Sequence, residues 1–465
     1  MKYPIVTGLF VLLMLSSGAR ATNVFNLEGF GPVSRALGGA GAAHDIGAAG
    51  MMYNPATLGL MELNGRGAEL YIGLDLIGTN IDTVNQATGE KAKSNKNSES
   101  NNRGPIYYAP QLAYTNNVGN LTLGVGAFAQ GGLGTEFGNT SFLSRTSTNN
   151  VDTGLDNSSR LLNLRIPFAA AYKVNERLTV GGSVDAVWTQ LNLELLLDVN
   201  QVGALAGDGR VSGSLVPTLL AIPNLSGAHF SLTKNDIVGG GTEGWGLGGK
   251  LGFTYQVSDT TRFGMAYNLE THVEDLSGRA VLTAVDNNNN HIPLSGKIKI
   301  RDFQNPAQLS LGVSHEINEQ LTVVADYNRV FWKDVMKDID IGFVQDGTGD
   351  NIDILLPQNY KDINLYSIGA EYQYTQAWIF RAGFSHSDQA LRSNLLFAVI
   401  PAQLQNHLTG GLAYSWSENS TFDFGLSYAF EKSMNNASLP NTDSAVPIKS
   451  SHRQINAVFG YSYRF

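Results

Sequence analysis

The chain has 465 residues, of which only 15% are charged, and it contains 52 glycines, 18 tyrosines and 21 phenylalanines. About a quarter of the residues of an ordinary soluble domain are charged, so this composition argues against a helical enzyme and favours a large all-β protein with tight turns. The net charge of −9 comes without a basic cluster, which argues against nucleic-acid binding, and the lack of cysteine excludes disulfides and thiolate sites.

The N-terminus predicts export from the cytoplasm. Lys2 precedes an apolar run from Ile5 to Leu15, and Ala19-Arg20-Ala21 follows as an A-x-A cleavage site. This pattern is that of a secretory signal peptide over residues 1–21, with cleavage before Thr22. Because the run is too short to span a bilayer as a helix, we expect an exported protein without a transmembrane helix, an uncleaved anchor being the alternative.

Residues 22–64 are rich in glycine and alanine and lack the alternation of a strand. Residues 65–465 are expected to form a wide barrel, for the reasons given next, and the lumen of such a barrel needs a plug unless it is an open pore. We therefore predict that residues 22–64 are a hatch folded into the lumen. Near its start, Phe25, Leu27 and Phe30 are candidates to occupy or line an inner pocket.

From residue 65 onward, apolar and polar residues alternate in long runs. In the stretch TFDFGLSYAF, for example, Phe422, Phe424, Leu426, Tyr428 and Phe430 share one face. Short polar connections alternate with long ones. The short ones are residues 116–120, 174–177, 257–261, 317–320, 374–377 and 417–420, and the long ones are 78–105, 131–159, 191–243, 277–299, 334–360, 387–404 and 433–450. This arrangement predicts about 14 antiparallel strands with short periplasmic turns and long extracellular loops, as in a transmembrane β-barrel of the bacterial outer membrane.

The chain ends on an alternating strand, INAVFGYSYRF, that continues to Phe465. A soluble β-sandwich also has alternating strands, but it does not separate short turns from long loops so consistently. In lipid every backbone group needs a partner within the protein, so we expect this last strand to pair with the first and close the barrel. The terminal aromatic residue also resembles the signal read by the barrel assembly machinery, which, with outer-membrane lipid, is an expected partner.

The stretch SRALGGAGAAHDIGAAGMMYNPATLGL, with Asn54-Pro55-Ala56 near its end, resembles the hatch of the FadL family of outer-membrane transporters for long-chain fatty acids and aromatic hydrocarbons. QLTVVADYNRVFWKDV (320–335), WIFRAGFSHSDQAL (378–391) and the closing strands are similar to late strands of that family. The resemblance implies a monomeric barrel of fourteen strands for passive uptake. It further implies capture of substrate in an apolar extracellular groove, transfer to an inner pocket as the hatch rearranges, and lateral release through the barrel wall.

Two long connections contain apolar stretches that are unusual for extracellular loops, and exposed apolar patches commonly mark binding. We predict that they form the groove for hydrophobic substrate; the residues are Leu215, Val216, Leu219, Leu220, Ile222, Leu225, Phe397, Val399 and Ile400. Packing of loop on loop to cap the barrel is the alternative. For a substrate carboxylate, Arg160 and Arg165 are candidate partners.

The predicted third strand, LTLGVGAFAQGGLG, has Gly124 and Gly126 on its lumen face, with further glycines after them. Phe128 lies on the same face, where a polar residue is expected. Glycines in a strand mark a bulge or a close backbone approach, and Pro110 and Pro167 on the neighbouring strands lack a ladder donor. We predict a lateral opening at Gly124 and Gly126, the alternative being glycines that only ease the curvature of the barrel.

No set of residues points to catalysis, a cofactor or a metal. GWGLGGKL lacks the serine or threonine of a phosphate-binding loop, no G-x-S-x-G or H-E-x-x-H motif is present, and the acidic loop around Asp346 does not have EF-hand spacing. A hydrophilic diffusion porin, a surface adhesin or phage receptor, and a barrel enzyme remain the alternatives. Which hydrophobic substrate is carried stays open.

Overall fold

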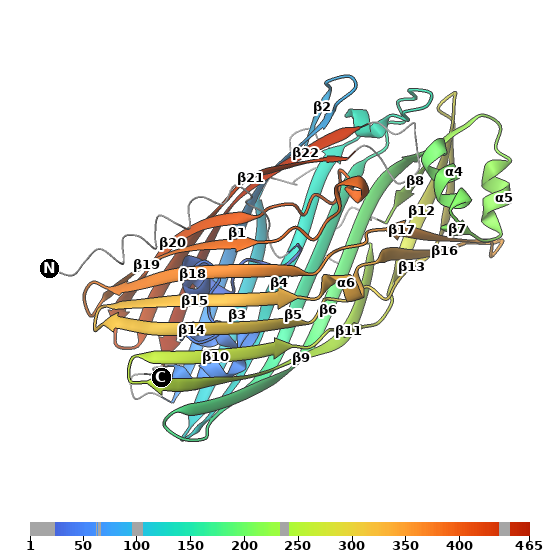
Figure 1. Cartoon of the computed structure of the whole chain (residues 1–465). Helices are drawn as coiled ribbons and strands as arrows, with labels where there is room; N and C mark the ends of the chain where they lie inside the picture. The colour runs from blue at the N-terminus through green and yellow to red at the C-terminus, as the bar shows by residue number, and fades with distance from the viewer. Residues whose placement is uncertain (1–23, 62, 64–66, 95–105, 233–240, 437–446) are drawn as a thin grey trace.

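The structure is a computed structural model that describes residues 24–61, 63, 67–94, 106–232, 241–436 and 447–465. Long antiparallel strands form a tilted wall around a lumen (Figure 1). The predicted signal peptide, residues 1–21, lies outside the described residues. Among the helices of the described segments, none is both long enough and apolar enough to cross a membrane.

Each strand of the wall pairs antiparallel with the next, and the last strand pairs with the first. In pairing order the strands are β1 (Ala68–Asn85), β3 (Ile106–Val118), β4 (Leu121–Gly138), β5 (Asn157–Lys173), β6 (Leu178–Asp198), β9 (Thr242–Ser258), β10 (Thr261–Asn268), β14 (Gln308–Asn318), β15 (Leu321–Val330), β18 (Ile363–Gln373), β19 (Trp378–Ser387), β20 (Asn406–Ser417), β21 (Ser420–Asn436) and β22 (Ile448–Arg464). The ring is closed, which confirms the predicted all-β barrel.

The C-terminal strand forms the seam of the barrel, as predicted. β22 pairs with β1 from Glu69 opposite Arg464 to Asn85 opposite Ile448. Beyond the strand, Phe465 and Ala68 exchange two backbone hydrogen bonds, of 3.0 and 3.2 Å. The chain therefore stays paired to its last residue, and no free strand edge remains at the seam.

The two faces of the wall differ in polarity. On β22 the side chain of Phe459 is 49% exposed on the outer face, whereas its neighbour Val458 is fully buried on the lumen face. The outer face carries tyrosines, phenylalanines and aliphatic residues along all the wall strands, and the lumen face carries buried polar residues such as Asp75, Asp185 and Lys250. This alternation is that of a transmembrane barrel with an apolar band facing lipid.

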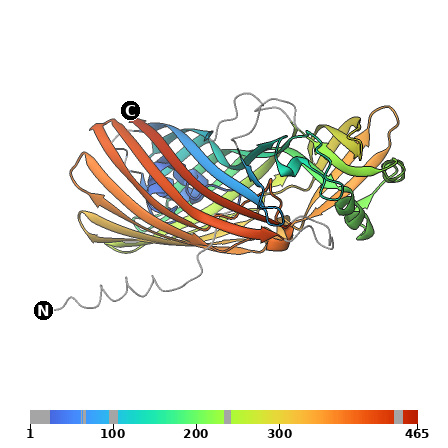
Figure 2. The same cartoon turned by 90° about the horizontal axis from the view of Figure 1, so that it is seen from above.

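The predicted short turns are confirmed: each joins consecutive wall strands at one end of the barrel (Figure 2). The long connections, predicted as extracellular loops, contain helices and strands of their own. They contain β2 (Lys91–Lys93), α4 (Val199–Gly207), β7 (Val211–Ser212), α5 (Leu215–Leu220), β8 (Leu225–Ser231), β11 (His272–Val273), β12 (Leu276–Asp286), β13 (His291–Arg301), α6 (Trp332–Val335), β16 (Asp338–Gln345) and β17 (Asn351–Pro357), with the 3-10 helices η3 (Phe142–Ser144) and η4 (Ser393–Leu395). β6, β8, β12, β13, β16 and β17 pair in succession and continue the sheet beyond the wall, where alternating isoleucines such as Ile298 and Ile300 bury one face.

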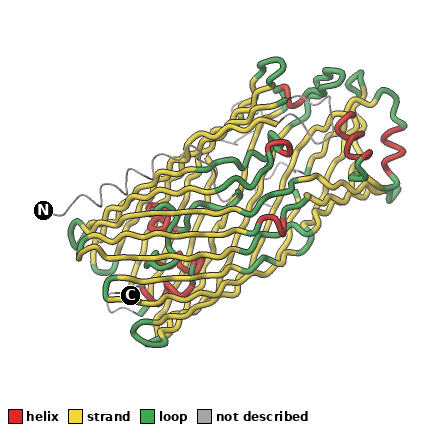
Figure 3. Tube along the Cα trace, in the orientation of Figure 1, coloured by secondary structure: helices red, strands yellow, loops and turns green. Residues whose placement is uncertain are grey.

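The N-terminal inner segment, residues 24–61, lies inside the ring of strands (Figures 1 and 3). It contains α2 (Gly31–Ala36), η1 (Gly47–Ala49), α3 (Gly50–Tyr53) and η2 (Pro55–Leu60). Its contacts with the wall are specific: the backbone N–H groups of Gly41 and Ala42 donate to the Asp326 carboxylate of β15 at 2.8 and 2.9 Å. Leu37, Met51 and Met52 are buried, so the segment is packed in the lumen rather than loosely threaded through it.

Candidate substrate-binding site

The ladder between β3 and β4 stops halfway along the wall. The two strands pair from Val118 opposite Leu121 up to Gln111 opposite Phe128. Beyond this point β3 still pairs with β1 as far as Ile106, and β4 still pairs with β5 as far as Gly138. Between residues 106–110 of β3 and 129–138 of β4 the wall therefore has no ladder.

Local sequence explains why the ladder stops there. Pro110, the residue after the last pair, has no N–H to donate. On β4 the register with β5 shifts between Ala129 and Gly131, which is the signature of a bulge. A Cβ at Gly131 would lie 2.1 Å from the carbonyl oxygen of Phe25, and one at Gly134 would lie 2.4 Å from the Tyr107 ring. At Gly131 the near atoms are backbone, so only glycine fits there, whereas a larger residue at position 134 requires the Tyr107 side chain to move.

The start of the N-terminal inner segment occupies the free edge of β4. Gly132 N–H donates to the Phe25 carbonyl at 2.8 Å, and Leu27 N–H donates to the Gln130 carbonyl at 3.3 Å. Asn26 forms an isolated antiparallel bridge with Gly131, and its side-chain oxygen accepts from the Gln130 amide at 3.1 Å. Residues 25–27 thus take the place of β3 as the hydrogen-bonding partner of this part of β4.

An apolar cavity of about 90 Å³ lies between this segment and the break in the ladder. Its lining includes Phe25 and Leu27 from the inner segment and Tyr107 and Leu161 from the wall. It also includes Tyr108, whose side chain is 68% exposed on the outer face. The lining therefore includes residues of the inner segment and a residue whose side chain is exposed on the outer face.

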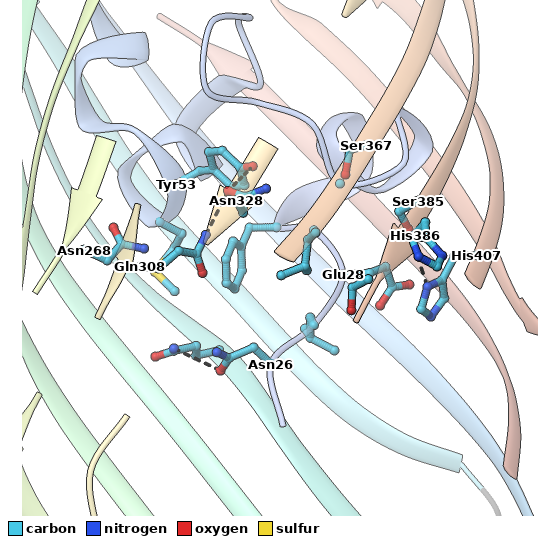
Figure 4. Close-up of a pocket in the computed structure, with 18 of the residues that line it drawn as sticks. Asn26, Glu28, Tyr53, Asn268, Gln308, Asn328, Ser367, Ser385, His386 and His407 are labelled. Atoms are coloured by element: carbon cyan, nitrogen blue, oxygen red, sulfur yellow. Dashed lines mark hydrogen bonds between the residues drawn. The ribbon is translucent and has the colours of Figure 1, made fainter. Parts of the chain in front are cut away.

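A second, polar cavity of about 50 Å³ lies on the lumen side of the same segment (Figure 4). Asn26, Glu28 and Tyr53 line it from the inner segment, and Asn268, Gln308, Asn328 and His407 line it from the wall. Tyr53 donates to Asn328 at 3.0 Å, and the Gln308 amide donates to the same Asn328 oxygen at 3.1 Å. Residues 26–28 therefore separate a polar lumen from an apolar opening.

Phe25 packs in an aromatic cluster at the extracellular end of the lumen. Its ring lies 5.5 Å from Trp332 in an edge-to-face arrangement and 6.1 Å from Tyr360. Trp332 and Tyr360 are themselves 6.0 Å apart. Phe25 therefore packs in an apolar environment of aromatic rings, in the edge-to-face geometry that such rings prefer. Burial raises the pKa of Tyr360, so its hydroxyl stays neutral.

The inner segment is anchored by a buried group of three charges. The Arg35 guanidinium forms ion pairs with Glu28 at 2.9 Å and with Asp75 of β1 at 3.0 Å, and Asn456 of β22 donates to Glu28 at 3.0 Å. Burial by itself raises the pKa of Glu28, but Arg35, His407 and the hydrogen bonds to the carboxylate together outweigh this effect, and the pKa is lowered to about 2. Glu28, which follows the residues at the β4 edge, is thus held in a fixed position.

The Asn54-Pro55-Ala56 motif begins η2 and fixes it to the wall. The Asn54 side-chain oxygen accepts from Ala56 N–H at 3.1 Å, and its amide donates to the carbonyls of Ala42 at 2.6 Å and Phe253 at 3.1 Å. Pro55 occupies the first turn, where its missing N–H is not needed. A single asparagine therefore caps one short helix and connects it to another part of the segment and to β9.

Gly124 and Gly126, predicted at the opening, lie in the part of β4 that is still paired with β3. A Cβ at Gly124 would be 2.9 Å from the end of Met51, and one at Gly126 would be 2.5 Å from the Phe128 ring. Phe128 is fully buried in the same apolar cluster as Met51, and Phe30 packs at the edge of that cluster. The structure thus places these residues against the inner segment, and the ladder breaks a few residues further on.

The two apolar stretches predicted to form an extracellular groove lie in different places: Phe397, Val399 and Ile400 are buried, whereas the stretch from Leu215 to Leu225 is only partly buried. Phe397 and Val399 line a cavity of about 120 Å³ together with Leu195, Leu196 and Ile448. Ile400 is buried next to them. Leu215, Val216, Leu219 and Leu220 form α5, with Ile222 and Leu225 after it, and none of these six lines that cavity. Leu215 and Leu219 are buried, whereas Leu220 remains exposed.

The candidate carboxylate partners are already engaged. Arg165 forms an ion pair with Asp185 at 3.2 Å, and the Arg160 guanidinium lies 6.0 Å from the Tyr107 ring centroid. Sequence reasoning did not single out Tyr107, Trp332, Tyr360 or Arg35 as functional. Tyr107 lies on an alternating strand, Trp332 on α6, Arg35 on α2 and Tyr360 in the connection before β18, and each contacts a segment distant in the chain, so no local signal identified them.

Comparison with known proteins agrees with this architecture. The sequence profile of the family described as outer membrane protein transport protein (OMPP1/FadL/TodX) matches residues 9–465. The toluene transporter TbuX of Ralstonia pickettii is 50% identical, with a TM-score of 0.79, over 95% of this chain and 99% of its own. The toluene transporter TodX of P. putida is 38% identical, with a TM-score of 0.83, over 95% of this chain and 99% of its own. A long-chain fatty acid transport protein of Escherichia coli O6:H1 (strain CFT073) is 24% identical over 87% of this chain and 85% of its own. The chain therefore belongs to the OMPP1/FadL/TodX family of outer membrane transport proteins and resides in the bacterial outer membrane.

Proposed function

We propose that this chain is a channel for passive uptake of monoaromatic hydrocarbons, which leave the lumen sideways through the break between β3 and β4. The observation that carries the proposal is the apolar cavity between residues 25–27 and the lipid-facing Tyr108. An apolar solute that entered the polar lumen beneath would lose about 25 cal/mol for each Å² of apolar surface exposed to water. Lateral release into the bilayer avoids this cost.

The similarity to TbuX and TodX supports an aromatic substrate over a long-chain fatty acid. The cluster of Phe25, Trp332 and Tyr360 supports the same choice, because ring edges and faces recognise aromatic molecules. The engagement of Arg165 by Asp185 also leaves that cation less suited to a carboxylate. Long-chain fatty acids remain the second substrate class.

In this proposal, residues 22–64 are the hatch and residues 65–465 are the barrel, which acts as a monomer. Substrate is captured at the extracellular cavity lined by Phe397 and Val399. It then displaces residues 25–27 from the edge of β4. Outer-membrane lipid receives the substrate, and the barrel assembly machinery inserts the chain.

Uptake assays test the proposal. Cells that lack the protein are compared with cells that express it, with labelled toluene, labelled oleate and a labelled hydrophilic sugar as substrates. We expect toluene uptake to rise with the protein and sugar uptake to stay at background. Equal gains for the sugar would favour a hydrophilic porin, and no gain for either hydrophobic substrate would favour a receptor or adhesin.

A further inference from the structure

A row of aromatic rings crosses the outer face near the extracellular ends of β15, β18 and β19. Tyr327 lies opposite Tyr366, which lies opposite His386. The ring centroids of the first pair are 5.5 Å apart, and those of the second pair are 6.5 Å apart and stacked. Aromatic rows of this kind sit at the boundary between the acyl chains and the headgroups of a membrane.

The next outward-facing row is polar and hydrogen-bonded. Arg329 lies opposite Asn364, donates to its side-chain oxygen at 3.1 Å and pairs with Asp362 at 3.1 Å. The Asn364 amide donates to Asp388 at 2.6 Å. Two residues of a strand span about 7 Å, so this row lies at the level of lipid headgroups.

Three further basic residues gather around the same row. Lys333 N–H donates to the Asp362 carboxylate at 3.0 Å, Lys361 N–H donates to the Ala390 carbonyl at 2.9 Å, and Arg392 Nε donates to the Asn359 carbonyl at 2.7 Å. The side chains of Lys333, Lys361 and Arg392 are exposed. In the part of the chain that the structure describes, neither lysine ammonium group has an ion-pair or hydrogen-bond partner. We call Arg329, Lys333, Lys361 and Arg392 the basic patch.

The basic patch carries four positive charges, and three carboxylates lie in it or beside it: Asp362, Asp388 and the exposed Asp334, which follows Lys333 on α6. An open hollow lies beside it and is lined by Lys361, Asp388, Arg392 and Met434. At the extracellular end of β9 and in the segment after β10 the exposed charges are the carboxylates Glu243, Glu270 and Glu274.

We propose that the basic patch binds the phosphates of a phosphorylated glycolipid of the outer leaflet, lipid A, whose acyl chains lie along the face with Tyr327 and Tyr366. Guanidinium and ammonium groups are the usual partners of phosphate. A free phosphate ion would meet the same cations, but the aromatic row directly beneath them places the phosphate of a membrane lipid there. This interaction is independent of the transport proposed above.

The test measures binding of lipid A to the purified, folded barrel in detergent by native mass spectrometry. Three ligands are compared: diphosphoryl lipid A, the same lipid after enzymatic removal of its phosphates, and inorganic phosphate. For Lys333→Gln/Lys361→Gln we expect affinity for diphosphoryl lipid A to fall about fivefold per lysine, the factor that corresponds to ~1 kcal/mol for a basic residue near an anionic surface.

The matched control is Lys91→Gln/Lys297→Gln, which removes two charges from extracellular strands away from the patch and should keep wild-type affinity. Heat-modifiable mobility on gels verifies that each variant forms the barrel. Lipid A that binds equally well without its phosphates would overturn the proposal, as would unchanged affinity in the Lys333/Lys361 variant. Saturable binding of inorganic phosphate that displaces no lipid would overturn the assignment to a lipid.

Discussion

Buried ion pairs of Arg35 anchor the inner segment in the lumen. Arg35 is the only cation paired with Glu28 and Asp75 in the described residues, and the side-chain exposures are 0% for Arg35, 4% for Glu28 and 0% for Asp75. Removing one partner of a buried ion pair costs about 3–5 kcal/mol, because the other charge stays buried without compensation. Arg35→Met leaves two such carboxylates, so the cost should lie at the upper end, ~5 kcal/mol.

Hydrogen exchange of the inner segment measures this cost without unfolding the barrel. Gly39 N–H donates to the Ser34 carbonyl at 2.8 Å and Gly38 N–H to the Arg35 carbonyl at 3.2 Å, so both amides report on α2. Each 1.4 kcal/mol is a factor of ten, and Arg35→Met should therefore reduce their protection by roughly 4 × 10³-fold. Arg464→Met, which breaks the ion pair with Glu69 at 3.0 Å, should leave them unchanged.

A rescue variant distinguishes charge from packing. Replacing a buried ion group by neutral residues of similar shape is often close to neutral. Arg35→Met/Glu28→Gln/Asp75→Asn should therefore recover most of the lost protection. The reasoning is refuted if Arg35→Met keeps wild-type protection, or if the triple variant is no better protected than Arg35→Met.

Three further predictions follow from the same region. The pKa of Glu28 is lowered from 4.5 to about 2, so the stabilisation that ionised Glu28 gives the inner segment is complete above about pH 4.5 and is lost as the pH falls toward 2. Hydrogen-exchange protection of α2 should therefore drop between these two pH values. Glu28→Gln should abolish this pH dependence. Gly134→Val places a Cβ 2.4 Å from the Tyr107 ring and should reduce toluene uptake severalfold at equal amounts of folded barrel. Adding Tyr107→Ala should restore uptake. Normal uptake in Gly134→Val would argue against an exit between β3 and β4. Phe25→Ala removes a buried ring that packs on Trp332, which should destabilise the packing of the inner segment by ~3–5 kcal/mol. Conductance recordings in planar bilayers should then show channel openings that the wild type and Phe25→Leu largely lack.

Much of the fold could be predicted from the sequence because apolar and polar residues alternate within each strand. Alternation along each strand places one set of side chains outside and the other in the lumen, as Phe459 and Val458 do. Short polar connections mark the tight turns, and the alternating run up to Phe465 predicts the seam with β1. The same period is present in KIKIR of β13 and in DIDIGF of β16, which form strands within connections predicted to be extracellular loops.

The candidate site was only partly accessible from the sequence. Glycines and Pro110 in neighbouring strands predicted a weakness in the wall, yet Gly124 and Gly126 pack against Met51 and the ladder ends beyond them. The residue at which the ladder between β3 and β4 ends depends on where Phe25 and Asn26 contact β4. The sequence of β4 alone does not predict where this contact forms.

The sequence by itself determined which residues face lipid and that the chain closes on its own end. Those features follow from the backbone's need for hydrogen-bond partners in a bilayer and from a period of two. Only the tertiary structure decided which residues meet across the lumen: Arg35 with Asp75, Phe25 with Trp332, and residues 25–27 with the free edge of β4. These contacts join segments far apart in the chain, and their formation depends on the diameter and register of the closed barrel rather than on any local pattern.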